Sequence, residues 1–207
     1  MKYKTYSHNL AESIIEGKPE FKSVYNEIIE VIESITDKMI INEYNTVKSI
    51  RGGAKSPSQA INQLIDKELI NKSWEPQSHI FLDPQYQREK KEKKGFRWYL
   101  DFAKEPFSIE VAFNHREATA HNLIKPLLAS QLNHVEKKIQ TEMGIIITAT
   151  SELKRMGNFD GSIGTYELFV EYLKPYANIL TVPIMIIGLK AFDTFKIDKE
   201  TRNVVKI

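Results

Sequence analysis

Two acidic residues stand at matching places in two neighbouring strand-like segments. FRWYLDF (96–102) and FSIEVAF (107–113) each alternate large apolar side chains with other residues. Because successive side chains of a strand point to opposite faces, Asp101 and Glu110 fall on the polar faces of their strands. If the segments pair as a hairpin, both carboxylates can converge on one cation. Spacing alone also allows two solvated acids on a half-exposed hairpin.

A close pair of carboxylates favours a particular chemistry. Two such groups repel each other and resist ionising together unless a cation joins them. A hard divalent ion with oxygen ligands suits such a site, and magnesium typically keeps several of its waters there. A magnesium ion so placed polarises a phosphate, activates water and stabilises a leaving oxygen. The pair of Asp101 and Glu110 therefore indicates metal-assisted phosphate chemistry.

The surrounding pattern predicts an α/β fold with a mixed central β-sheet flanked by helices. The continuous apolar runs GIIITAT (144–150) and VPIMIIG (182–188) are typical of strands covered on both faces. We expect a single domain over residues 1–207, with an N-terminal helical segment over about 1–50 and a polar tail with at most one edge strand over 190–207. Apolar residues at helical spacing predict helices over 9–35 (in two pieces divided at Gly17-Lys18-Pro19), 57–74, 117–139 and 164–177.

Composition narrows the class of protein. The net charge of +2, from 29 basic and 27 acidic residues, neither requires nor excludes a nucleic-acid partner, so a DNA binder must concentrate its positive charge locally. The absence of cysteine excludes disulfides, thiolate metal sites and a cysteine nucleophile, and the five histidines show no HExxH spacing. The chain shows neither a signal peptide at its N-terminus nor a segment of membrane-spanning length, so we expect a cytoplasmic protein.

Several segments resemble the type II restriction endonucleases of the BglII/BstYI/BamHI group, a branch of the PD-(D/E)xK nuclease superfamily. The resemblance covers about residues 50 to 190. It includes the helix SPSQAINQLIDKELINKSW (56–74), Asp101-Phe102 and Glu110-Val111 at the family's DF-x7-EV spacing, and the strands in GIIITATSELK (144–154) and VPIMIIGL (182–189).

The resemblance implies a magnesium-dependent, site-specific DNA endonuclease of a restriction system. By position, Asp101 and Glu110 resemble the family's metal-binding acids, and Gln77 resembles a further active-site polar residue, with Glu75 a weaker candidate. The family also implies a homodimer on double-stranded DNA, in which each subunit cuts one strand of a short palindrome, for which a GATC core is our guess. By resemblance, the segments 117–139 and 164–177 form the dimer interface.

One position departs from the family pattern. Two residues after the second acid the family has Lys, Glu or Gln, whereas this chain has Ala112, whose methyl group can neither orient water nor bind a metal. A neighbour (Glu117, His115 or Gln77) can stand in, or the chain is a deliberately disabled variant, or it has lost activity naturally and only binds DNA. The main alternative function is thus a catalytically inactive, sequence-specific DNA-binding protein. A third class, an enzyme or interaction domain without a nucleic-acid partner, predicts no DNA retardation at low salt.

Two segments carry side chains suited to reading bases. Asn114, His115 and Arg116 directly follow the second strand, and asparagine suits adenine while arginine suits guanine, although Asn114 equally suits a helix cap. The glycine-rich segment 156–167 resembles a second recognition segment. Its candidates for reading bases are Asp160, Ser162 and Thr165.

Other residues are candidates for contacts with the phosphate backbone. Gly52, Gly53 and Lys55 can approach it closely, and the basic run 88–94 is either a phosphate contact or a solvated loop. We expect His121 and His134 to be packing or interface residues.

Overall fold

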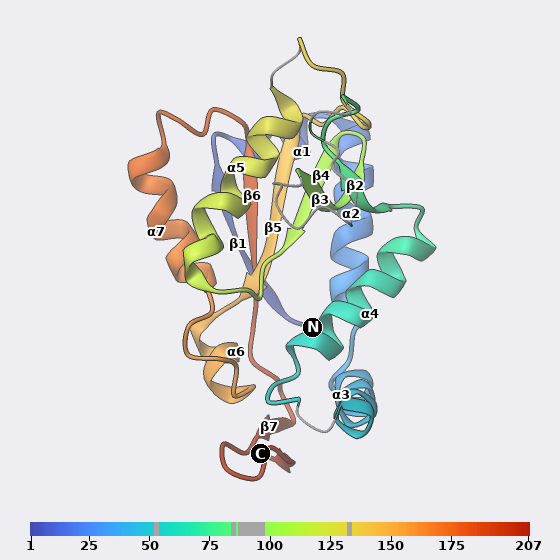
Figure 1. Cartoon of the computed structure of the whole chain (residues 1–207), viewed down its shortest axis with the longest axis vertical. Coiled ribbons are helices and arrows are strands. Elements are labelled where there is room, and N and C mark those ends of the chain that lie inside the picture. Colours follow the sequence, from blue (N-terminus) through green and yellow to red (C-terminus); the bar gives the residue numbers. More distant parts are fainter. Residues whose placement is uncertain (52–53, 84–85, 87–97, 132–133) are drawn as a thin grey trace.

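A six-stranded mixed sheet, with the strand order β1-β6-β5-β4-β3-β2, forms the centre of the molecule (Figure 1). The computed structural model describes residues 1–51, 54–83, 86, 98–131 and 134–207. Strands β4, β5 and β6 run parallel to one another, and the other neighbours are antiparallel. The strands are β1 (Tyr3–His8), β2 (Glu75–His79), β3 (Tyr99–Lys104), β4 (Phe107–Val111), β5 (Met143–Ala149) and β6 (Ile184–Leu189). The mixed sheet with flanking helices confirms the expected fold class.

Helices cover both faces of this sheet (Figure 1). Along the chain they are α1 (Ala11–Gly17), α2 (Pro19–Ser34), α3 (Asp37–Arg51), α4 (Ser58–Asn71), the 3-10 turn η2 (Arg116–Ala118), α5 (Thr119–Ser130), α6 (Ser151–Met156) and α7 (Tyr166–Tyr176). Side chains of α2 and α4 pack in one apolar cluster with Ile145 and Ile147 of β5. Side chains of α5 and α7 pack on the opposite face with Ile146. The alternation along β5 explains why its sequence is continuously apolar, since both faces are buried.

The N-terminal segment begins with a strand that the sequence analysis missed. β1 pairs antiparallel with β6, from Tyr3 opposite Leu189 to His8 opposite Ile184. The helical extension expected over about 1–50 therefore starts only at Ala11. The segment YKTYSH is mostly polar, and its pairing with a distant strand, rather than its own pattern, makes it extended.

The helix expected over 117–139 is wrong in its second half. α5 ends at Ser130, and the backbone beyond it is extended at Gln131. Residues further on lie beside the segment after β2, where Leu82 N–H donates to Glu136 O at 3.0 Å. Val135 and Ile139 pack there against a small apolar cluster. Their spacing fits a helix equally well, but this non-local pairing decides the conformation.

The C-terminal segment 190–207 buries more apolar side chains than the expected polar tail would. Two short strands, β7 (Phe195–Ile197) and β8 (Val204–Lys206), pair with each other in a separate sheet. Phe192, Phe195 and Ile197 are buried in the main apolar cluster, so the first part of 190–207 is a core element. Among the described residues, no helix is both long enough and apolar enough to cross a membrane.

Candidate active site

The two predicted acids meet where the β3–β4 hairpin ladder ends. The antiparallel register pairs Phe102 with Ile109, and the next residues outward are Asp101 and Glu110. Beyond this point the side chain of Asp101 replaces a backbone acceptor, because Val111 N–H donates to Asp101 Oδ2 at 2.8 Å. The hairpin that sequence spacing left conditional is therefore present, and it brings the two carboxylates together.

Glu110 does not lie on a solvated face. Its residue exposure is 2%, because the face of β4 that carries it is covered by α5. Burial raises the pKa of the Glu110 carboxyl to about 8, and the negative charge of Asp101 acts in the same direction. The charge of Lys125 and the backbone N–H of Asp101 oppose this shift. The interpretation of two ordinary acids on a wet hairpin is therefore wrong for Glu110.

Asp101 is less enclosed than its partner. Partial burial raises the pKa of its carboxyl, while the Val111 N–H, the charge of Lys125 and the side-chain amide of Gln77 favour the charged form. The two acids thus differ in environment, and Asp101 is the one that faces a cavity.

Lys125 of α5 is a site residue that the sequence analysis missed. Its Nζ lies 2.5 Å from Glu110 Oε2, and the two side chains are only 10% and 3% exposed. The same ammonium lies 5.5 Å from the centre of the Tyr99 ring. A sequence signal did exist, because Lys125 is the one charged residue within the otherwise apolar run 123–129.

Gln77 lies beside Asp101, as the family resemblance implies. β2 pairs with β3 so that Pro76 faces Phe102 and Ser78 faces Leu100, which places Gln77 opposite Asp101. Its φ of 48° is in the left-handed region, which non-glycine residues rarely adopt and which tends to mark functional sites. The weaker candidate Glu75 is engaged elsewhere, in an ion pair with Lys138 at 2.5 Å.

A cavity of about 260 Å³ opens beside Asp101 and Gln77 and reaches across to helix α4. Two residues one helical turn apart, Asn62 and Asp66, line it from that helix. Burial raises the pKa of Asp66 to about 6, and the charge of Asp101 adds to the shift. The Oδ1 atom of Asn62 is buried without a hydrogen-bond partner in the described structure. Sequence analysis assigned no role to either residue.

The donor set suits a hard divalent cation. Asp101 and Glu110 supply carboxylate oxygens, and Glu110 Oε1 is buried with no hydrogen-bond partner among the described residues. An unsatisfied buried carboxylate oxygen is costly unless a ligand completes it. Within the described part of the chain, no group of three or more His, Asp or Glu side chains is arranged to hold a metal. The residues therefore fit an ion that takes two protein carboxylates and keeps other oxygen ligands.

The two expected recognition segments come together in space. His115 Nδ1 lies 2.5 Å from Ser162 Oγ, which in turn donates to Asp160 Oδ1 at 2.6 Å. The backbones also meet, since Arg116 N–H donates to Ser162 O at 2.8 Å. The side chains of His115 and Asp160 are exposed, so these contacts leave a polar surface next to the acids.

Asn114 and Thr165 make contacts other than those that join His115, Ser162 and Asp160. Asn114 caps no helix; its Oδ1 accepts from Asn122 Nδ2 at 3.1 Å, and its exposed side chain lines the cavity beside Asp101. Thr165 is 8% exposed and lies directly before α7. Lys55 is exposed, and its charge helps to lower the pKa of Asp160.

Among the described residues, the structure assigns no contact with the acid pair to the remaining ones that the sequence analysis named. Gly52, Gly53 and the basic run 88–94 lie outside the described residues. The ring of His121 packs 5.2 Å from that of Trp98, as expected for a packing residue, and His134 is exposed. Glu117 is also exposed and lies on η2.

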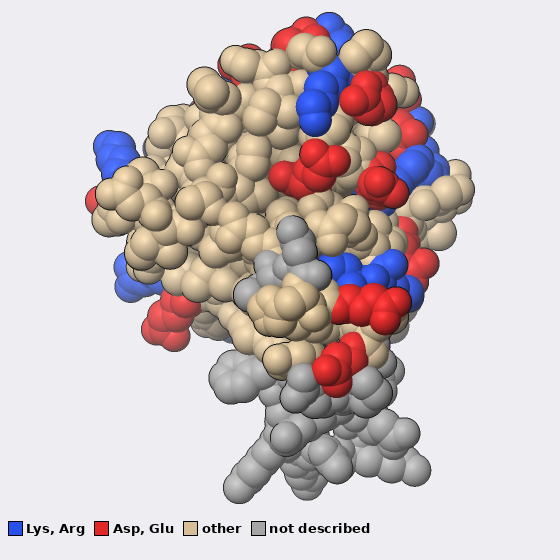
Figure 2. Space-filling model, turned by 90° about the horizontal axis from the view of Figure 1, so that it is seen from above, with Lys and Arg blue, Asp and Glu red and all other residues tan. Residues whose placement is uncertain are grey.

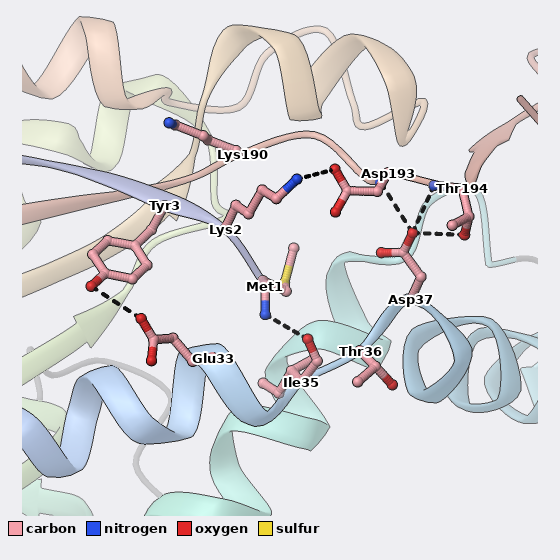
Figure 3. Close-up of a pocket in the computed structure, with 10 residues that line it drawn as sticks. All are labelled: Met1, Lys2, Tyr3, Glu33, Ile35, Thr36, Asp37, Lys190, Asp193 and Thr194. Atoms are coloured by element: carbon pink, nitrogen blue, oxygen red, sulfur yellow. Dashed lines mark hydrogen bonds and ion pairs between the residues drawn. The ribbon is translucent and has the colours of Figure 1, made fainter.

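A larger cavity of about 620 Å³ lies far from this chemistry, at the N-terminus (Figure 3). Its polar groups bond to one another. Lys2 pairs with Asp193 at 2.8 Å, and Asp37 accepts from Thr194 Oγ1 at 2.7 Å. The N-terminal ammonium donates to Ile35 O at 2.5 Å. These bonds hold the first residues of the chain in place. Among the described residues that line this cavity, no group of unpaired polar side chains points to one common ligand position.

Comparison with known proteins identifies the family of the chain. The family model described as "Restriction endonuclease BglII/BglIII" matches residues 3–189. The chain belongs to this family. The crystal structure of restriction endonuclease BglII complexed with a DNA 16-mer matches with a TM-score of 0.66 and 23% identity, over 100% of this chain and 88% of that chain. Free BglII matches with a TM-score of 0.57 and 21% identity, over 100% of this chain and 91% of that chain.

The comparisons confirm the resemblance and the fold. At these identities the two BglII structures establish the shared fold, while the family match supports a site-specific DNA endonuclease. A search of curated proteins finds no matching relative.

Proposed function

We propose that the protein is a magnesium-dependent type II endonuclease that hydrolyses both strands of a short palindromic DNA site. One observation carries the proposal: the hairpin of a restriction-endonuclease fold brings Asp101 and Glu110 together, with one carboxylate oxygen of Glu110 left without a partner. The preferred target contains GATC, which follows from the family resemblance.

Asp101 and Glu110 would hold the magnesium ion. When bound, the ion polarises the phosphate and activates a water molecule. Asp101 is fixed for this role by the Val111 N–H, because a carboxylate held by a backbone donor has little freedom to turn away. Gln77 is exposed, lines the same cavity as Asp101 and can orient the attacking water through its amide.

DNA recognition is assigned to the surface where 113–117 meets 156–167. Asn114, His115 and Arg116 lie on one strand-to-helix connection, and Asp160 and Ser162 lie against them. The hydrogen bonds between the segments hold their side chains in a fixed arrangement, which base readout requires. Lys55 adds positive charge for a phosphate. The BglII structure complexed with DNA supports a DNA partner for this fold.

We assign the dimer interface to the side of the molecule formed by α5 and α7. Seen from above, charged residues gather on the right of the molecule and are fewer on the left, where α5 and α7 lie (Figure 2). Interface cores are depleted in charge relative to other surfaces. Two-fold symmetry of the protein would then match the symmetry of a palindrome.

Cleavage of plasmid DNA tests the function. Purified protein is incubated with plasmid and Mg²⁺, and the fragment ends are sequenced. We expect discrete fragments whose ends define one short palindrome. If the protein does not cleave, and neither the Ala112→Gln nor the Ala112→Glu variant does, the proposal fails.

The alternative is an inactive, sequence-specific DNA-binding protein on the same fold. Ala112 favours it, because this position on the strand offers only a methyl group. It predicts selective retention of particular sequences from a random DNA pool with no cleavage in any divalent cation. Binding would then respond to Asp101→Ala only through the loss of one negative charge.

A further inference from the structure

The least exposed ion pair among the described residues lies in the site itself. Lys125 and Glu110 have side-chain exposures of 10% and 3%, whereas both members of each of the other pairs are at least a quarter exposed. Removing a lysine ammonium from water is costly, and attraction to one carboxylate only roughly offsets that cost. Stability alone therefore gives little reason for a lysine at this position.

The packing of α5 determines where this ammonium lies. Pro126 sits directly on Gly144 of β5, so closely that a Cβ at Gly144 would lie 2.5 Å from Pro126 Cβ. The glycine thus lets the helix approach the sheet at the residue next to Lys125. From there the lysine side chain extends to β4, where its Nζ lies 2.5 Å from Glu110 Oε2.

Ala112, which lacks a functional group, lies on the side of the sheet that α5 covers. Ala112 directly follows β4 and continues its pairing with β5, since its N–H donates to Ile147 O at 2.8 Å, so it lies on the same face as Glu110. Ala112 is 1% exposed and packs with Leu123 of α5 and with Ile146. Because the methyl group of Ala112 is small, α5 can pack closely against this face of the sheet. A lysine from that helix supplies a positive charge beside Glu110.

We propose that Lys125 is the third catalytic residue of the site and provides from α5 the group that Ala112 lacks on β4. This inference rests on the proposed nuclease function. During hydrolysis the water oxygen forms a bond to phosphorus, and the bond from phosphorus to the leaving sugar oxygen breaks. The proton of the water passes to solvent, and the leaving oxygen takes a proton from solvent. The Lys125 ammonium keeps its protons and donates a hydrogen bond to a phosphoryl oxygen, where negative charge accumulates.

Lys125→Gln is the direct test, with Lys104→Gln as the matched control. Lys104 also pairs with a glutamate, Glu27, at 2.7 Å, but it lies at the far end of β3 from Asp101. We expect Lys125→Gln to lower the single-turnover cleavage rate by about 100-fold or more, the usual effect of removing one charge-stabilising donor. Specific DNA binding, measured without divalent cations, should change by less than about threefold, since binding contacts lie elsewhere. Lys104→Gln should cleave at the wild-type rate.

A second experiment restores the amine. Because the chain has no cysteine, Lys125→Cys carries a single thiol. Aminoethylation of that thiol in denaturant, followed by refolding, rebuilds a lysine-like side chain, whereas carbamidomethylation gives a neutral one. We expect cleavage to return only with the amine. This comparison uses one protein refolded in the same way, so a folding defect would affect both products.

The outcomes separate the two proposals. A wild-type protein that binds its DNA site but never cleaves it overturns the nuclease function, and Lys125 then has no catalytic role. A wild-type protein that cleaves, with Lys125→Gln cleaving within about threefold of it, overturns only the role of Lys125. Equal activity of the aminoethylated and carbamidomethylated proteins also overturns that role.

Discussion

At the scale of the residue, the site is a set of charges placed in unequal surroundings. Glu110 is enclosed and bonded to Lys125, whereas Asp101 faces a cavity and is held by a backbone N–H. Asp66 lies across that cavity, and its carboxyl, whose pKa is about 6, adds a negative charge at neutral pH. Without a cation these carboxylates repel one another, so the metal-free site is electrostatically strained.

Replacing either acid should stop cleavage without loss of DNA binding. Asp101→Asn and Glu110→Gln remove carboxylate charge that would bind magnesium, and we expect cleavage to fall by about 1,000-fold or more. Binding in the absence of divalent cations should be equal or tighter, because less negative charge then faces the phosphates. Plasmid cleavage and gel retardation measure the two effects. A variant that still cleaves within about tenfold of the wild type contradicts the assignment.

Asp66 should make stability depend on pH. Its carboxyl pKa is about 6 in the folded protein, against 3.8 for an ordinary aspartate, so the folded state binds more protons between these values. The contribution of Asp66 to the stability of the wild type therefore falls as pH rises from about 4 to about 6, and then levels off. Asp66→Asn lacks this contribution and should gain in thermal midpoint over the wild type across the same interval. A constant difference between the two proteins from pH 4 to 7 would contradict it.

At the scale of the element, α5 positions the chemistry. It packs on β4 and β5, carries Lys125 to Glu110, and follows directly from the His115–Arg116 connection. The recognition segment and the catalytic strand are therefore both in contact with this helix. At Gly144 the helix packs directly on the sheet through the ring of Pro126.

A methyl group at Gly144 should disturb both stability and catalysis. An added Cβ would lie 2.5 Å from Pro126 Cβ, so α5 must shift outward and carry Lys125 with it. We expect Gly144→Ala to cost about 1–3 kcal/mol of stability, as overpacking typically does. Cleavage below the unfolding temperature should fall as well. Gly17→Ala is the control, because an added Cβ there meets nothing within 4 Å. Equal unfolding midpoints for the two variants would count against this packing argument.

At the scale of the whole molecule, the proposed cleavage of a palindrome requires two copies of the chain. One subunit holds one set of acids, whereas a palindrome has two equivalent scissile bonds. The side formed by α5 and α7 carries fewer charges than the opposite side in the view from above (Figure 2), and α5 follows directly from the proposed recognition segment 113–117. Pairing through this side would place two sites in a symmetric relation.

A charge placed beside α7 should weaken the dimer. Ile179 follows α7 and is 61% exposed, and Ile179→Glu introduces a charge that an interface would have to desolvate. Sedimentation of the wild type should give twice the mass of one chain, with the variant shifted toward one. Ile50→Glu on α3 is the control, since Ile50 is 77% exposed on a different helix. A dimer that both substitutions leave intact would place the interface elsewhere.

The sequence by itself determined the elements whose pattern is local. Alternation along 107–113 identified β4, and the continuous apolar runs identified β5 and β6, because burial on one face or on both leaves a direct mark on the order of residues. The spacing of Asp101 and Glu110 allowed an acid pair for the same reason, and the family resemblance favoured it. It could not show β1 or the end of α5 at Ser130, because both depend on pairing with distant segments.

Only the tertiary structure decided what completes the site. Lys125 is 15 residues from Glu110 along the chain, and it reaches that carboxylate because α5 packs against β4. Asp66 and Asn62 lie across the cavity from Asp101 because α4 crosses that end of the hairpin. His115 meets Ser162 across 47 residues. Such contacts arise from how helices pack on the sheet, and no pattern within a single element encodes them.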